Sequence, residues 1–241
     1  MSLLSRIFPP SLTQQIESQR LKWRNIPGLS PALQQLVATP LPDFNADVFS
    51  IPWLAFDFET SGLDANQDRI LSTGSVKVQS GQILLASAHH QYISSDSQVN
   101  AHSAVINHIT PEMLSDGEAL DDAMEMLFLR LTGHVAVVHG KMVERAFINA
   151  WLRTRYDTEE LPILWIDTLE LERRYQQARR QMHNDLRLSS LRREYQLPDY
   201  PAHHALCDAV ATAELLLVQL QSQRQVRVQG KCLPLNACLC G

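Results

Sequence analysis

The sequence has little that would cross-link or anchor the chain. It contains four cysteines in 241 residues, three of them among the last ten, and this arrangement does not resemble a disulfide framework. No apolar run approaches the ~18 residues needed to span a membrane. The first residues, Met-Ser-Leu-Leu-Ser-Arg, lack the apolar core of a signal peptide. We therefore expect a cytoplasmic protein without membrane contact.

An excess of positive charge is also missing. The chain has 21 Lys and Arg against 26 Asp and Glu, for a net charge of −5. A protein that coats nucleic acid needs a basic surface, so the composition argues against that class. The composition does not exclude an enzyme that binds only the end of a nucleic-acid strand, because a local basic patch can oppose the total negative charge. With 45% hydrophobic and 20% charged residues, the chain is typical of one large globular domain, alone or with an appendage.

The segment 53–63 is the most informative stretch, because it reads as a buried strand that ends in a turn. Alternation places Leu54, Phe56 and Phe58 on one face, and Trp53, Ala55, Asp57 and Glu59 on the other. Two carboxylates then point the same way from an apolar strand. Such charges need neutralisation, and a hard cation such as Mg²⁺ or Mn²⁺ provides it. The alternative is an edge strand with a solvated acidic face.

Three regions differ in pattern. Residues 1–47 are predicted to be a helical extension and linker that pack on the main domain, with helices at 12–23 and 31–37; a partner-docking arm is the alternative. Residues 48–222 are predicted to form the main domain. Residues 223–241 are expected to be a loose, cysteine-containing tail, because the three cysteines there lack an evident fourth zinc ligand.

The main domain reads as an α/β domain, in which a strand meander is followed by β-α-β units. Strands are expected at 69–78, 83–93, 135–138 and 163–167, in addition to the first. Short loops between the first three favour antiparallel pairing, with a turn at Gly81. Helices are expected at 118–132, 143–156, 168–180, 187–196 and 205–222, with a helical turn at 104–109 and a helix start at Thr110-Pro111. This order predicts a mixed sheet covered on both faces.

Three stretches place acidic residues at element ends, where their side chains can converge: residues 57–63, 138–147 and 203–209. Together they resemble the motifs of the DEDDh 3′–5′ exonucleases, the group that includes the proofreading epsilon subunit of bacterial DNA polymerase III. Residues 57–63 match D-x-E-T-[TS]-G-L, and residues 203–209 match H-x-A-x-x-D-A. The match to H-N-A-x-F-D is looser: His139 is in place, but Glu144 stands where Asp is usual. Residues 165–169 and 109–110 resemble weaker landmarks, so the resemblance covers about residues 50–222.

The resemblance implies a ribonuclease H-like fold with a five-stranded mixed sheet, and two divalent cations, Mg²⁺ or Mn²⁺. The resemblance further implies that the metals are held by Asp57, Glu59, Glu144 and Asp208. His203 is the general base, against the alternative of a surface histidine before a helix. Thr60, Ser61, Leu63 and His139 contact the substrate, against the alternatives of turn chemistry and helix capping. Seven arginines between residues 173 and 193 form a basic cluster that either tracks a phosphate backbone or is a solvated face.

The function expected from these residues is a metal-dependent exonuclease that removes nucleotides from the 3′ end of DNA and releases nucleoside 5′-monophosphates. An exoribonuclease that trims RNA 3′ ends or short oligoribonucleotides would use the same residues. A catalytically silent domain that binds nucleic-acid ends or a partner is the alternative of another class. The expected partner is a single-stranded 3′ end of nucleic acid; a polymerase or other protein partner stays open.

Overall fold

The computed structural model describes residues 11–94, 109–180, 185–201, 203–226 and 232–240. The helices are α1 (Leu12–Trp23), α2 (Pro31–Ala38), α4 (Pro111–Ser115), α5 (Leu120–Leu131), α6 (Met142–Tyr156), α7 (Thr168–Arg179), α8 (Leu188–Glu194) and α9 (Ala205–Val226). The short 3₁₀ helices are η2 (Val48–Ser50) and η3 (Leu235–Ala237), and the strands are β1 (Trp53–Thr60), β2 (Ile70–Gln79), β3 (Gln82–Tyr92), β4 (Val135–Val138) and β5 (Trp165–Asp167). The helical turn expected at 104–109 lies, apart from its last residue, outside the described residues.

Across the described residues, five strands form one mixed sheet in the order β3-β2-β1-β4-β5. β2 pairs antiparallel with both β1 and β3, whereas β4 pairs parallel with β1, and β5 pairs parallel with β4. The β2–β3 turn falls at Ser80 and Gly81, which both have positive φ, as hairpin turns with the right-handed strand twist require. The expected meander and mixed sheet are confirmed.

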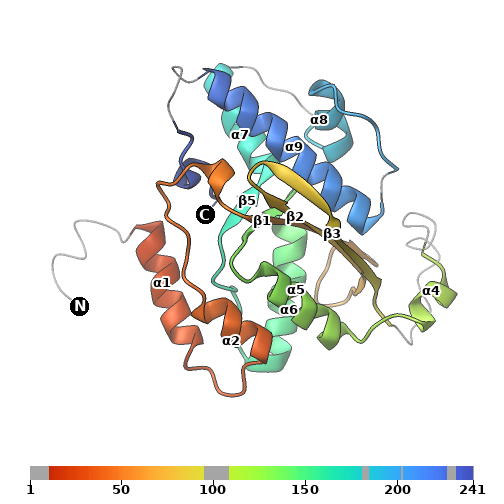
Figure 1. The fold of residues 1–241 in the computed structure, drawn as a ribbon. Helices are drawn as coiled ribbons and strands as arrows, with labels where there is room; N and C mark the ends of the chain where they lie inside the picture. Colours follow the sequence, from red (N-terminus) through yellow and green to blue (C-terminus); the bar gives the residue numbers. More distant parts are fainter. Residues whose placement is uncertain (1–10, 95–108, 181–184, 202, 227–231, 241) are drawn as a thin grey trace.

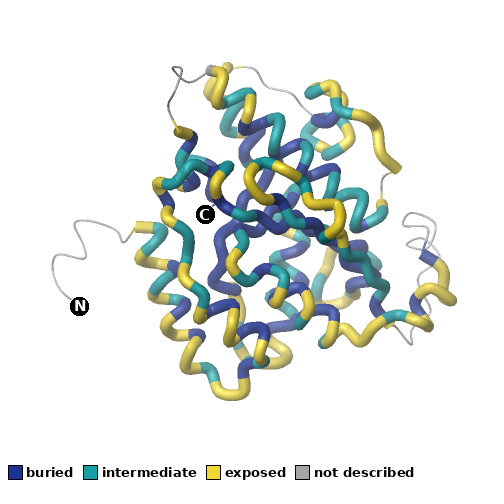
Figure 2. The backbone as a smooth tube through the Cα atoms, in the orientation of Figure 1, coloured by how far each residue is buried: buried dark blue, intermediate teal, exposed yellow. Residues whose placement is uncertain are grey.

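Each face of the sheet carries its own hydrophobic core, as the alternation along β1 predicts. Leu54, Phe56 and Phe58 face a core built with α2, α5 and α6. Trp53 and Ala55 face the other core, to which α7 and α9 contribute. Helices therefore cover both faces, as Figure 1 shows, and β1, β4 and β5 between them are buried almost throughout (Figure 2).

Helix α9 is long and largely apolar, although Asp208 and Glu214 interrupt its apolar sequence. Over Ala205–Gln225 it is long and apolar enough to cross a membrane by length and composition alone, with a mean hydropathy of 1.2. Half of that stretch is buried inside the domain, and Ala213, Leu216 and Leu220 belong to the core on its face of the sheet. The apolar residues of α9 thus have a partner within the chain. The helix also runs to Val226, so the domain boundary expected after residue 222 falls inside it.

The N-terminal helices pack on the main domain through a buried arginine. The guanidinium of Arg20 donates to the carbonyl oxygens of Pro162 (3.2 Å), Leu36 (2.6 Å) and Thr39. Two of these carbonyls lie at the C-terminal end of α2, where a cation is favourable. Residues of α2 also belong to the core that contains α5. The packing of this extension matches the expectation.

The C-terminal segment is not the loose tail that the sequence suggested. The backbone amide of Leu235 donates to Ala46 O (3.0 Å), and that of Cys240 donates to Trp165 O (2.9 Å), which places the segment against η2 and the β5 edge. Leu233, Leu235, Cys238, Leu239 and Cys240 are buried. No disulfide joins any of the four cysteines, and in the part of the chain that the structure describes none of them belongs to a group able to hold a metal.

Candidate active site

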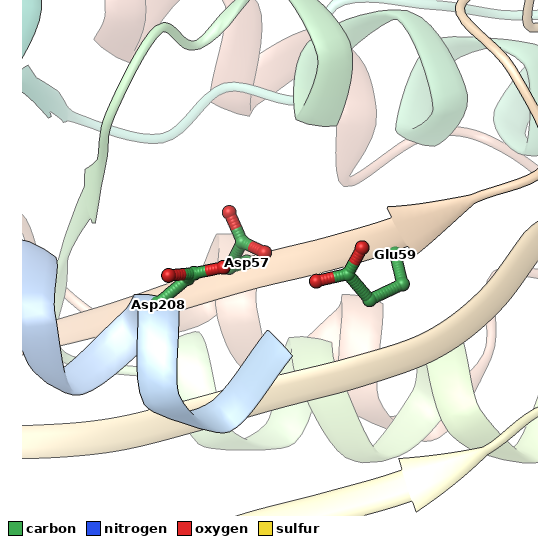
Figure 3. A group of neighbouring side chains, drawn as sticks. All are labelled: Asp57, Glu59 and Asp208. Carbon is green, nitrogen blue, oxygen red and sulfur yellow. The ribbon is translucent and has the colours of Figure 1, made fainter. Parts of the chain in front are cut away.

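Three carboxylates from two elements meet at one end of the sheet. Asp57 and Glu59 project from the same face of β1, and Asp208 lies in the first turn of α9. Figure 3 shows the three groups turned toward a shared space. One ligand oxygen from each lies within 4.8 Å of the others, a spacing that could hold a metal ion. They line a cleft of about 600 Å³ together with His139, Glu144 and His203.

Burial and mutual repulsion raise the pKa values of this carboxylate cluster. Burial raises the pKa of Asp57 well above its usual range, and the charges of Glu144, Asp208 and Glu59 add to the effect. Burial and the neighbouring Asp208 raise the pKa of Glu59 to about 8. The pKa of Asp208 is also raised, chiefly by burial. Raised values of this kind mark carboxylates that lack a counter-charge.

Glu144, in the first turn of α6, is the fourth acidic residue of the cleft. Its side chain is 3% exposed, and its Oε2 has no hydrogen-bond partner among the described residues. Burial raises its pKa to about 8, with Asp167 and Glu59 contributing. It stands outside the close trio but faces the same cleft. The looser second motif therefore places at the cleft a buried carboxylate oxygen that has no hydrogen-bond partner among the described residues, and the role of Glu144 as a metal ligand stays a prediction.

Asp167, at the end of β5, holds the loop that leads into α6. Its Oδ1 accepts from the backbone amides of Gly140 (2.8 Å) and Leu169 (3.0 Å), and its Oδ2 accepts from that of Lys141 (3.0 Å). These bonds fix the backbone three residues before Glu144. Sequence reasoning noted Asp167 only within a weak landmark. The available signal was an Asp directly before a helix, the position of an N-cap.

His139 is tied to neighbouring elements through both ring nitrogens. Its Nδ1 lies 2.8 Å from Thr168 Oγ1, and its Nε2 lies 2.9 Å from the carbonyl oxygen of Leu186. Burial lowers the pKa of the ring. Nε2 donates to the carbonyl oxygen of Leu186, and Nδ1 faces the Thr168 hydroxyl, which donates to Val138 O (3.2 Å). The ring lines the cleft but joins β4, α7 and the segment before α8. This geometry favours a structural role over the expected substrate contact.

The two adjacent histidines before α9 have different surroundings. His203 is exposed, lines the cleft, and donates its backbone amide to Asp208 Oδ2 (3.0 Å). The His204 ring stacks on His90 of β3, with centroids 4.5 Å apart, and its Nδ1 accepts from the Cys207 amide (3.4 Å). Of these two rings, only that of His203 belongs to a residue lining the cleft, and among the described residues it has no stacking or hydrogen-bond partner of this kind; its role as general base stays a prediction.

The turn after β1 uses its hydroxyl groups to hold itself. Thr60 Oγ1 donates to Gly62 O (2.7 Å), and Ser61 Oγ donates to Asp68 Oδ1 (3.0 Å). Both residues line the cleft, as does Leu63, whose side chain stands 79% exposed at its rim. The two hydroxyls thus stabilise the turn itself, which was the alternative to substrate contact. The exposed Leu63 stays available to a ligand.

The arginine cluster near α8 does not form one free basic face. Arg192 is buried; it pairs with Glu214 (2.8 Å) and donates to the carbonyls of Ala211 (2.9 Å) and Pro198 (2.8 Å). Arg174 donates to carbonyls of the C-terminal segment, and Arg187 pairs with Asp185. The exposed members are Arg173, Arg179, Arg180, Arg187 and Arg193. At least Arg174 and Arg192 act inside the fold.

Comparison with known families and proteins agrees with this geometry. Residues 54–216 match the family RNase_T, described as exonuclease. The chain is 28% identical over 177 residues to the PolC-type DNA polymerase III of Thermotoga petrophila, and 27% identical over 177 residues to that of Bacillus subtilis. Each match covers 73% of this chain, which spans only 12% of the length of these relatives.

Solved structures with the same fold include nucleases with bound ligands. The nuclease domain of 3′hExo, a DEDDh family member bound to rAMP, has a TM-score of 0.62 at 14% identity, covering 77% of this chain and all of that one. Escherichia coli exonuclease I with single-stranded DNA has a TM-score of 0.62 at 19% identity, covering 73% and 42%. These likenesses confirm the ribonuclease H-like fold. The family match, which covers most of the chain, shows that this chain belongs to the RNase_T exonuclease family.

Proposed function

We propose that this chain is a metal-dependent exonuclease that hydrolyses phosphodiester bonds at the 3′ end of DNA and releases nucleoside 5′-monophosphates. One observation carries the proposal. Asp57, Glu59 and Asp208 bring carboxylate oxygens within 4.8 Å of one another in a cleft that also contains Glu144 and His203. Such a cluster is unfavourable without cations, and cations in such a cleft are suited to phosphate chemistry.

The residues present fit two divalent cations, Mg²⁺ or Mn²⁺. All four carboxylates offer hard oxygen ligands and have raised pKa values, and Glu144 Oε2 is buried without a hydrogen-bond partner among the described residues. Asp57, Glu59 and Asp208 would hold one ion, and Glu144 with Asp57 would help to hold the second. Bound there, the ions would supply positive charge against the phosphate oxygens and lower the pKa of the attacking water.

The chain's own groups would orient the substrate and move the proton. The His203 imidazole, exposed at the cleft, would accept the proton of the attacking water. Its backbone amide already binds Asp208, so the base is tied to a metal ligand. Leu63, at the rim, would pack against the terminal base, while Thr60 and Ser61 would shape the wall beside it.

DNA is favoured over RNA by the sequence relatives. Those at 27–28% identity are DNA polymerases by name, whereas the rAMP-bound 3′hExo domain shares only the fold at 14% identity. Exoribonuclease activity is therefore the second candidate. The single-stranded 3′ end and the cytoplasmic location stay predictions from the sequence, as does a polymerase partner.

The test is digestion of 5′-labelled DNA and RNA oligonucleotides of one sequence by the purified chain. We expect a ladder that shortens from the 3′ end, nucleoside 5′-monophosphates as products, faster loss of DNA, and complete inhibition by EDTA. Asp57→Asn, at the shared ligand, should abolish the ladder while keeping the unfolding transition. Faster RNA loss would select the exoribonuclease. Absence of digestion, or equal activity of Asp57→Asn in EDTA, would refute a metal-dependent nuclease.

A further inference from the structure

Gly74 lies on the strand next to β1, directly opposite a proposed metal ligand. In the antiparallel ladder, Gly74 of β2 is the partner of Asp57 on β1. Gly74 is buried, and it is not among the glycines with positive φ, so its backbone conformation is one that other residues adopt. A lone glycine inside a strand then indicates a close approach of another backbone.

That backbone is the start of α9. A Cβ placed on Gly74 would lie 2.5 Å from the carbonyl oxygen of Ala205, and closer still to the carbonyl carbon of Ala205 and the amide nitrogen of Leu206. All three are main-chain atoms, so no side-chain rotation could relieve the overlap. Asp208 lies on the same first turn of α9. Any side chain at Gly74 must therefore push the beginning of α9 away from the sheet.

We propose that Gly74 is a positioning residue that sets the distance between Asp208 and the carboxylates of β1. The missing side chain lets α9 begin directly over β2, where Asp208 reaches the space shared with Asp57 and Glu59 (Figure 3). The inference rests on the proposed function for the identity of the bound cation. The close contact between α9 and β2 stands independently of it.

Gly117 provides a matched control. A Cβ there would lie 2.6 Å from Ser94 N, 2.7 Å from Ile93 C and 2.9 Å from Tyr92 O, which are again main-chain atoms. Gly117 lies beyond the end of β3 and does not line the cleft. Gly117→Ala therefore imposes a clash of the same kind without moving a carboxylate of the site.

The experiment measures Mn²⁺ binding by isothermal titration calorimetry and thermal unfolding for wild type, Gly74→Ala and Gly117→Ala. Both variants should unfold at lower temperature, because overpacking is destabilising. Gly74→Ala should weaken Mn²⁺ binding roughly 10- to 100-fold, the scale for groups that orient metal ligands. Gly117→Ala should keep the wild-type affinity. Equal affinities in all three proteins would overturn the proposal.

A second variant tests the displacement itself. Glu is one methylene longer than Asp, so Asp208→Glu should weaken Mn²⁺ binding in wild type yet partly restore it in Gly74→Ala. Additive losses in the double variant would overturn the positioning role. If Gly74→Ala showed no cooperative unfolding transition, the contact between Gly74 and α9 would be needed for folding itself, and this result would also overturn the positioning role. Mn²⁺ binding without hydrolysis in wild type would refute only the proposed function, whereas absence of Mn²⁺ binding in wild type would refute both.

Discussion

Replacing Glu59 by Gln should stabilise the metal-free protein while removing its response to metal. The substitution deletes one charge from the carboxylate cluster and keeps the size of the side chain. Glu59 is 7% exposed, and its pKa is raised to about 8 by burial and by Asp208. Folding therefore disfavours the ionised form of the Glu59 carboxyl. An amide in its place avoids that penalty but cannot serve as an anionic ligand.

Two routes give a similar magnitude for the effect. If both groups were ionised, unit charges within 4.8 Å of each other would repel by at least about 3.5 kcal/mol at an effective dielectric constant of about 20, and this is the free energy that opposes ionisation of Glu59. A carboxyl whose pKa rises from 4.5 to about 8 on folding lowers the free energy of unfolding at pH 7 by about 3 kcal/mol. Since the buried amide also loses water, we expect a gain of about 2 to 3 kcal/mol, or roughly 5–10 °C in Tm for a domain of this size.

The assay is thermal unfolding at pH 7, first in EDTA and then with Mn²⁺. Wild type should gain stability with Mn²⁺; Glu59→Gln should unfold at higher temperature than wild type in EDTA and gain little from Mn²⁺. Glu118→Gln, at an exposed carboxylate, is the control and should stay within about 0.5 kcal/mol of wild type in EDTA. If Glu59→Gln has a lower Tm than wild type in EDTA and still responds to Mn²⁺, the cluster is not the repulsive site described above.

Three further outcomes are expected. In EDTA the wild-type free energy of unfolding should fall as pH rises from about 4.5 to about 8, because the folded state binds more protons than the unfolded chain in that window; urea titrations at several pH values check this, and a rise would contradict it. Glu144→Gln should lower the hydrolysis rate more than Glu144→Asp, measured on one oligonucleotide, and equal wild-type rates would mean that Glu144 is no ligand. His203→Ala should lower that rate by roughly 10²-fold or more with little change in oligonucleotide binding, whereas a loss confined to His204→Ala would reassign the base.

Local pattern was sufficient to predict the central strand and its two faces. Along β1, Leu54, Phe56 and Phe58 enter one core while Trp53 and Ala55 enter the other, as alternation requires. The antiparallel meander followed from short loops, and the parallel strands followed from intervening helices. These inferences depend on neighbours in sequence, which a single chain displays directly.

Contacts between distant segments were not predictable in the same way. The C-terminal segment reads as polar and loose, yet it pairs with residues near 46 and with Trp165, more than 70 positions away. Arg192 reads as part of a basic face, but its partners on α9 and in the segment after α8 bury it. A charged residue and a cysteine-rich end look solvated in sequence until the surfaces that cover them are known.

The adjacent histidines show how the fold resolves an ambiguity that spacing alone leaves open. His204 points its ring toward β3, where it stacks on His90 and accepts from the first turn of α9. His203 has φ of 64°, a left-handed conformation that is costly for a residue with a side chain and that persists where surrounding contacts determine it. Its amide bond to Asp208 is such a contact. The reversal of the backbone at His203 sends the two rings to different places, so that one belongs to the packing of α9 and the other to the cleft.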